Sequence, residues 1–131
     1  MRGRLDASRG LAAFLAAAGL NHFLMPRFYD AMIPEPLPGS ARSWTYGSGI
    51  AELAVAAAVA GRRTRRAGAL AAAALFVTVL PGNVKMASDA FRRHRPMRER
   101  VVLLLRLPVQ FPLIRWALNV SREQAHGTIA G

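Results

Sequence analysis

The stretch AGALAAAALFVTV, residues 67–79, runs for thirteen residues without a charged side chain. It is one of four apolar blocks, and the other three cover residues 10–25, 44–61 and 101–120. With a few flanking residues, each block approaches the roughly 20 residues that a helix needs to cross a bilayer. A small soluble domain would alternate apolar and polar residues along its helices. The blocks therefore predict an all-α membrane protein.

The chain of 131 residues is long enough for one ordinary domain, and its four blocks predict a bundle of four transmembrane helices over residues 1–131. We expect helices at about residues 5–25, 43–61, 67–91 and 101–120, with a kink at Pro81 in the third. The alternative is a small, alanine-rich soluble bundle. Against it, residues 44–61 contain a single charged side chain, Glu52, and no polar stripe of helical period.

The net charge of +11 comes from seventeen arginines and one lysine against seven acidic residues. Nine of the arginines form two clusters between apolar blocks, within residues 62–66 and 92–100. This placement suits anionic lipid head groups, whereas a nucleic-acid surface would interleave the arginines with aromatic residues. We therefore expect the lipid bilayer as a partner and no nucleic acid. The absence of cysteine excludes disulfides, thiolate metal sites and thiol redox chemistry in this chain.

Ten polar residues lie in or next to the apolar blocks, where lipid should exclude them: Asn21, His22, Ser48, Glu52, Thr78, Asn83, Lys85, Arg106, Gln110 and Arg115. A charged group near the bilayer centre costs about 2.5–3.5 kcal/mol on insertion scales, so such groups should turn inward and find partners. Glu52 is near the middle of its helix, and Arg106 shares a helix face with Gln110, four residues on. We expect Glu52 to pair with Arg106, with His22 and Gln110 completing the hydrogen bonds.

This polar cluster is open to two interpretations. The Glu52–Arg106 pair can lock two helices together, or it can bind a polar head such as a quinone carbonyl or a lipid head group, or relay protons. His22 can likewise be a satisfied bundle histidine or a ligand, and Asn83 is expected to cap or bridge the kinked helix.

No metal site is expected, because the histidines at 22, 94 and 126 stand in different segments without ligand spacing. The sequence also has no nucleophile elbow, phosphate loop or dinucleotide fingerprint, which gives no reason to expect a reaction by this chain alone.

Four segments in this order resemble the DoxX-like membrane proteins: GLNHFLMPRFYDAMIPEPLP (19–38), YGSGIAELAVAAAV (46–59), VLPGNVKMA (79–87) and RLPVQFPLIRWAL (106–118). The resemblance implies a compact four-helix integral membrane protein of the bacterial inner membrane. Named members of that family look like subunits of a thiosulfate:quinone oxidoreductase or partners in oxidative-stress complexes, and most have no assigned reaction. By position in these segments, the resemblance implies a polar centre made of His22, Glu52, Asn83, Arg106 and Gln110.

Three functions fit these expectations. The first is a non-catalytic membrane subunit or scaffold that binds a partner protein, a second copy of itself or a lipid-like molecule in its bundle. The second is a quinone-interacting subunit of an oxidoreductase, in which His22 and Arg106 hydrogen-bond the quinone carbonyls, Glu52 handles protons and a redox partner is obligatory. The third is a small transporter or lipid carrier, for which four spans are few unless the chain oligomerises.

Overall fold

The computed structural model describes residues 2–33 and 37–129, and it is all-α. Four long helices and one short helix follow each other along the chain: α1 (Arg2–Leu24), α2 (Pro26–Asp30), α3 (Ala41–Ala60), α4 (Arg65–Arg92) and α5 (Met97–Ile129). No strand occurs in the part of the chain that the structure describes. The expected all-α class is therefore confirmed.

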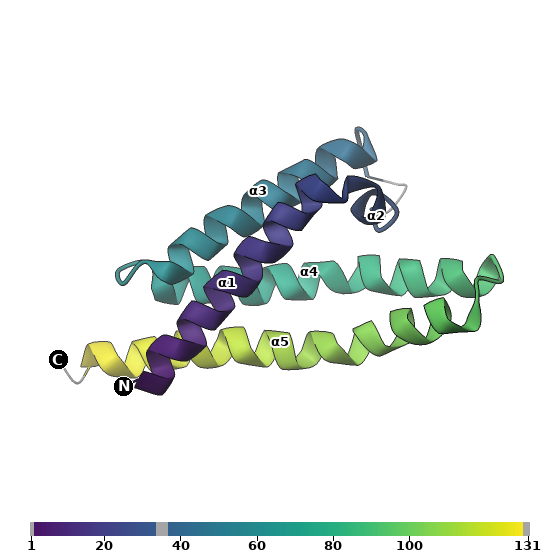
Figure 1. Cartoon of the computed structure of the whole chain (residues 1–131). Coiled ribbons are helices and arrows are strands. Elements are labelled where there is room, and N and C mark those ends of the chain that lie inside the picture. Colours follow the sequence, from purple (N-terminus) through teal and green to yellow (C-terminus); the bar gives the residue numbers. More distant parts are fainter. Residues whose placement is uncertain (1, 34–36, 130–131) are drawn as a thin grey trace.

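The long helices form two antiparallel pairs (Figure 1). α1 runs along α3, and α4 runs along α5. The pairs cross at an angle and pack on each other near the end that holds both chain termini, while α2 lies at the far end of α1. Figure 1 shows the α1–α3 pair diverging from the α4–α5 pair toward that far end.

Prolines and caps set the helix ends. α1 stops at Leu24, and Pro26 takes the first position of α2, where its missing N–H costs nothing. The side chain of Ser40 caps α3 by accepting a hydrogen bond from the backbone N–H of Ser43. α4 continues helically through Pro81, as the sequence predicts.

The expected helix at 101–120 was too short at both ends. α5 starts at Met97, directly after Pro96, and continues to Ile129, so that the charged residues flanking the apolar block are helical as well. The residues from Arg122 to Ile129, which follow the predicted helix, are helical as well. Charged residues are good helix formers, and hydropathy alone does not reveal where such a helix ends.

The hydrophobic core lies where the two helix pairs cross. Leu11 and Leu15 of α1 meet Val59 of α3, Phe76 of α4 and Val120 of α5, and all five side chains are buried. Small residues at the contacts let the backbones approach closely, which is how helices pack when lipid removes the hydrophobic drive between them. A Cβ added at Gly68, for example, would lie 2.7 Å from the backbone nitrogen of Val59.

Among the described residues, two helices are long and apolar enough to cross a membrane, namely α4 and α5, whereas the sequence predicted four. In α1, Arg9, Asn21 and His22 lower the mean hydropathy, and in α3 Glu52 and the polar residues 43–48 do the same. Each of the two candidate spans, α4 and α5, contains an apolar window of 18 residues. The buried share of this window is 39% in α4 and only 11% in α5. The bundle therefore leaves much of its most apolar surface uncovered.

Residues 26–33, here called the α2 segment, contact all four long helices. The carboxylate of Asp30 accepts hydrogen bonds from Thr45 Oγ1 at 2.6 Å and from Arg42 Nε at 3.0 Å, both on α3. Partial desolvation raises the pKa of Asp30, but these two hydrogen bonds outweigh it and hold the pKa below its ordinary value. The backbone oxygen of Ala31 accepts a hydrogen bond from Lys85 Nζ on α4 at 3.0 Å.

The contact between α1 and α3 at Gly49 generates the first testable prediction. A Cβ at Gly49 would lie 2.9 Å from both His22 Cβ and Phe23 Cε2. We expect Gly49→Ala to destabilise the bundle by about 1–3 kcal/mol, because overpacking outweighs the gain in helix propensity. Thermal unfolding in mild detergent, followed by circular dichroism, measures the change.

Gly47→Ala is the matched control, because a Cβ at Gly47 meets nothing within 4 Å. This variant should be as stable as the natural chain or slightly more stable. Equal stability of the two variants would contradict the close approach of α1 and α3.

Candidate functional site

The five residues expected to form one polar centre divide into three groups. His22 and Glu52 meet between α1 and α3, Asn83 and Gln110 meet between α4 and α5, and Arg106 lines a cleft beside the α2 segment. None of the hydrogen bonds or ion pairs among residues 2–33 and 37–129 joins one group to another.

The first group is built around the buried ring of His22. Its Nδ1 lies 2.8 Å from the backbone oxygen of Ala18, and because a carbonyl only accepts, Nδ1 carries the proton. Tyr29 of α2 stacks on the ring with 3.7 Å between centroids, and the Tyr29 hydroxyl accepts a hydrogen bond from Asn21 Nδ2 at 2.8 Å. The ring of His22 is therefore fixed by contacts within α1 and with α2.

Glu52 reaches this group from α3. Its Oε2 lies 3.5 Å from His22 Nδ1, but it accepts no hydrogen bond within the described part of the chain, because the Nδ1 proton is directed at Ala18. The expected pairing of Glu52 with Arg106 was wrong. The ionisable side chain that meets Glu52 is His22 of the neighbouring helix α1, which the glycine contact at Gly49 brings close to α3.

The second group joins α4 to α5. Gln110 Nε2 donates to the backbone oxygen of Phe76 at 2.8 Å, and Gln110 Oε1 accepts a longer hydrogen bond of 3.5 Å from Asn83 Nδ2. Both side chains are buried. The carbonyl of Phe76 is one residue before the carbonyl that loses its partner to Pro81. The expected bridging role of Asn83 in the kinked helix thus takes the form of a side-chain bond to α5.

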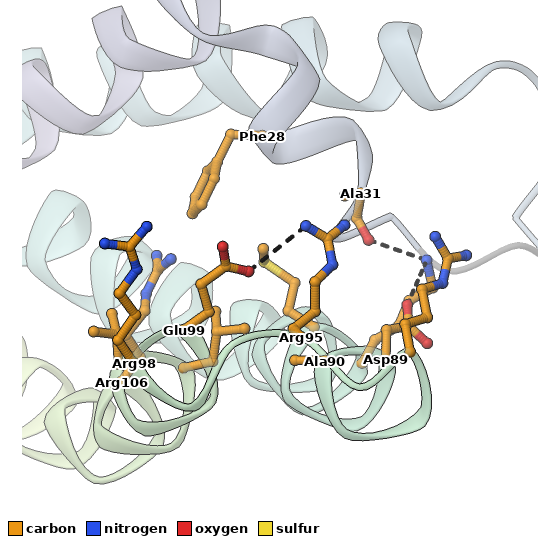
Figure 2. A pocket seen from close by; sticks show the side chains of 13 residues that line it. Phe28, Ala31, Asp89, Ala90, Arg95, Arg98, Glu99 and Arg106 are labelled. Carbon is orange, nitrogen blue, oxygen red and sulfur yellow. Dashed lines mark hydrogen bonds and ion pairs between the residues drawn. The ribbon is translucent and has the colours of Figure 1, made fainter.

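A cleft of about 810 Å³ lies between the α2 segment and the far halves of α4 and α5 (Figure 2). Figure 2 shows Phe28 pointing into it from α2, opposite Glu99 and Arg106. Two ion pairs cross its rim, Lys85 with Asp89 at 3.9 Å and Arg95 with Glu99 at 3.6 Å. The cleft is lined by Phe28, Ala31, Lys85, Met86, Asp89, Ala90, Arg93, Arg95, Arg98, Glu99, Val102, Leu103 and Arg106.

Arg106 is held in this cleft by an aromatic ring. The guanidinium carbon lies 5.0 Å from the centroid of the Phe28 ring, within the range of a cation–π contact. Phe28 in turn packs edge-on against Tyr29, with 5.3 Å between centroids. Adjacent residues of α2 therefore reach two different groups, since Tyr29 stacks on His22 while Phe28 faces Arg106.

Sequence reasoning missed most of the cleft. Arg98 and Glu99 were assigned to a polar connection, although both belong to α5. A signal was present in the spacing, because residues 98, 102 and 106 stand four apart and share one helix face. Nothing in the sequence shows that Phe28 of α2 meets Arg106 of α5.

The His22–Glu52 contact can be tested by a double-mutant cycle. His22→Phe keeps a ring to stack on Tyr29 but removes both nitrogens, and Glu52→Gln removes the charge. We expect the two changes to be coupled by about 0.5–3 kcal/mol in the free energy of unfolding, measured in mixed micelles.

Arg106→Met combined with Glu52→Gln serves as the reference cycle. Because no contact joins these side chains, their effects should add within about 0.5 kcal/mol. Additive effects in the first cycle would show that Glu52 does not interact with His22. Coupling in the second cycle would show that Glu52 interacts with Arg106.

Comparison with known proteins places the chain in a family without assigning an activity. No curated protein and no solved structure matches it. The match that exists does not link the chain to the DoxX-like proteins, so that resemblance stays a prediction. Residues 11–121, most of the chain, match the family described as Domain of unknown function (DUF8561), and the chain belongs to this family.

Proposed function

We propose that this protein is a multi-pass integral membrane protein that carries out no reaction of its own and binds a lipid-like molecule in the cleft beside the α2 segment. The observation that carries the proposal is the exposure of its most apolar helices. Only 11% of the apolar window of α5 is buried, although it has the length and composition of a membrane span.

A soluble protein does not account for this exposure. The core helix of a soluble domain can be as apolar as α5, but it is then mostly buried. A signal sequence can be as apolar, but it lies near the N-terminus, whereas α4 and α5 are the last two helices. Large apolar side chains along α5, among them Val101, Leu104, Leu105, Val109 and Phe111, are exposed. A lipid environment would cover them.

The packing favours four spans over two. α1 packs along α3, and the two contact α4 and α5 around a shared core. Lipid that surrounds α4 and α5 would then also surround this second pair. Two of the polar residues that lower the hydropathy of α1 and α3 face each other, because His22 meets Glu52 inside the bundle. Such inward pairing is what a membrane requires of ionisable residues.

The cleft suits a lipid-like ligand in size and in lining. Pockets for small molecules occupy about 300–1,000 Å³ and are lined mostly by apolar side chains with a few polar groups. Here Phe28, Met86, Val102 and Leu103 provide apolar surface, and charged side chains provide most of the remaining lining. The long pocket beside lipid-exposed helices would admit a molecule from the bilayer.

A quinone-interacting redox subunit in the bacterial inner membrane, as the DoxX-like resemblance implies, is less well supported. It would need His22 and Arg106 to face one ligand. Arg106 lines the cleft and His22 does not, so these two donors do not both face this cleft. A quinone bound in the cleft would be detected in the ligand measurement below.

Single cysteines can test the number of spans, because the natural chain has none. Leu37→Cys, Arg63→Cys and His94→Cys place thiols in the three connections between long helices. If all four long helices span, positions 37 and 94 react with an impermeant maleimide from one side of the membrane and position 63 from the other. If only α4 and α5 span, positions 37 and 63 share a side. Release of the chain from membranes by alkaline carbonate would overturn both arrangements.

Ligand binding in the cleft can be tested with a side chain that fills it. Val102 lines the cleft and is exposed, so Val102→Trp should occupy the space without disturbing the core. We expect native mass spectrometry of protein purified in mild detergent to show a bound lipid-like molecule, and Val102→Trp to lose it.

Val101→Trp is the matched control, because Val101 is also exposed but lies outside the cleft lining. It should retain the ligand. Absence of any ligand from the natural protein, even after adding bilayer lipids, would contradict the proposal.

A further inference from the structure

The cleft carries more positive charge than its own residues neutralise. Five cationic side chains line it, Lys85, Arg93, Arg95, Arg98 and Arg106, against two carboxylates. The two carboxylates are already engaged, Asp89 with Lys85 and Glu99 with Arg95. Within residues 2–33 and 37–129, no carboxylate lies within ion-pair distance of Arg93, Arg98 or Arg106. An excess of three positive charges is therefore left for a ligand to neutralise.

The positions of the unpaired arginines define one wall of the cleft. Arg98 and Arg106 stand eight residues apart on one face of α5, about 12 Å along the helix axis at ~1.5 Å per residue. Val102 lies between them on the same face. Arg93 lies just beyond the end of α4, where α4 connects to α5. The free guanidinium groups thus extend from the connection at residues 93–96 down toward the middle of the chain's most exposed apolar helix.

Apolar surface continues directly from this charged wall. Val102 and Leu103 line the cleft, and Val101, Leu104 and Leu105 of the same turns are exposed outside it. A small inorganic anion would use only the guanidinium groups and leave these side chains bare. An amphiphile with an anionic head and apolar chains matches both features.

We propose that the cleft binds an anionic phospholipid, with the phosphate head group at Arg98 and Arg106 and the acyl chains along the exposed face of α5. This inference rests on the proposed function, because it names the chemical class of the ligand in the same cleft. Arg106 is suited to this role since Phe28 fixes its guanidinium without neutralising it. Arginine also binds phosphate oxygens through two parallel hydrogen bonds.

The experiment compares phosphatidylglycerol with phosphatidylcholine of identical acyl chains, each titrated onto delipidated full-length protein in mild detergent and followed by native mass spectrometry. We expect one phosphatidylglycerol per chain, bound more tightly than phosphatidylcholine. Each arginine near an anionic head group contributes roughly fivefold in affinity. Arg98→Gln with Arg106→Gln should therefore weaken phosphatidylglycerol binding roughly 30-fold. Binding of phosphatidylcholine should weaken less, because its choline offsets the phosphate charge.

The matched control removes two arginines outside the cleft, Arg92→Gln with Arg122→Gln, so that the net charge falls equally. It should keep the affinity for phosphatidylglycerol. An equal loss in both double variants would mean that overall charge attracts the lipid, and would overturn the inference. The single variant Arg98→Gln, at an exposed position, should weaken binding roughly fivefold and gives the same test if the double variant unfolds.

The remaining outcomes separate this inference from the function it rests on. If both lipids bind equally and Val102→Trp blocks both, the cleft binds lipid without distinguishing an anionic from a zwitterionic head group. The proposed function then stands and the inference fails. If inorganic phosphate displaces phosphatidylglycerol at equal concentration, the ligand is a free anion and the inference fails. If neither lipid nor phosphate binds, both proposals fail.

Discussion

The hydrogen bonds between Asp30 and α3 hold the α2 segment in place, and both candidate sites depend on that segment. Thr45 and Arg42 bind the two oxygens of one carboxylate, so α2 cannot turn without breaking both contacts. With Asp30 fixed, the preceding two residues point in different directions, and Tyr29 stacks on His22 while Phe28 faces Arg106. A five-residue helix that begins at Pro26 thus positions an aromatic ring in each of two groups on different helix pairs.

The arrangement of the helices also requires glycine at two close helix contacts. Gly49 lets α1 approach α3 until His22 reaches Glu52, and Gly68 lets α4 approach the end of α3. The Gly49 contact lies at the last residues of α1, next to α2, whereas the Gly68 contact lies beside the core residue Val59. The α1–α3 pair diverges from the α4–α5 pair toward α2. The cleft occupies the space next to α2 at that diverging end. The close contact at Gly68 and the cleft beside residues 85–90 therefore lie at opposite ends of α4.

The sequence predicted the helices better than their partners. Four apolar blocks correspond to α1, α3, α4 and α5, and Pro26 and Pro81 act as expected, one ending a helix and the other accommodated within one. Polar residues such as Glu52 and His22 were recognised as needing partners, but hydropathy cannot tell which helices are neighbours. Pairing of Glu52 with His22 follows from the approach of α1 to α3, a tertiary contact. The helical start of α5 at Met97 was missed because charge was taken as a sign of a loop.

The exposed apolar side chains of α5 and the arginines without carboxylate partners favour the proposed lipid surroundings. A soluble bundle buries its most apolar helices and exposes its charges in neutralised or hydrated form. In this chain α5 is less buried than α4, the other long apolar helix. Beside α5, Arg93, Arg98 and Arg106 have no carboxylate within ion-pair distance among the described residues. Water would satisfy the arginines but not Leu104 or Leu105, and another apolar protein surface would do the reverse. Anionic lipid supplies both complements in one molecule, at the spacing between head group and acyl chain, which is why the cleft and the exposed face of α5 are best understood as parts of a single surface.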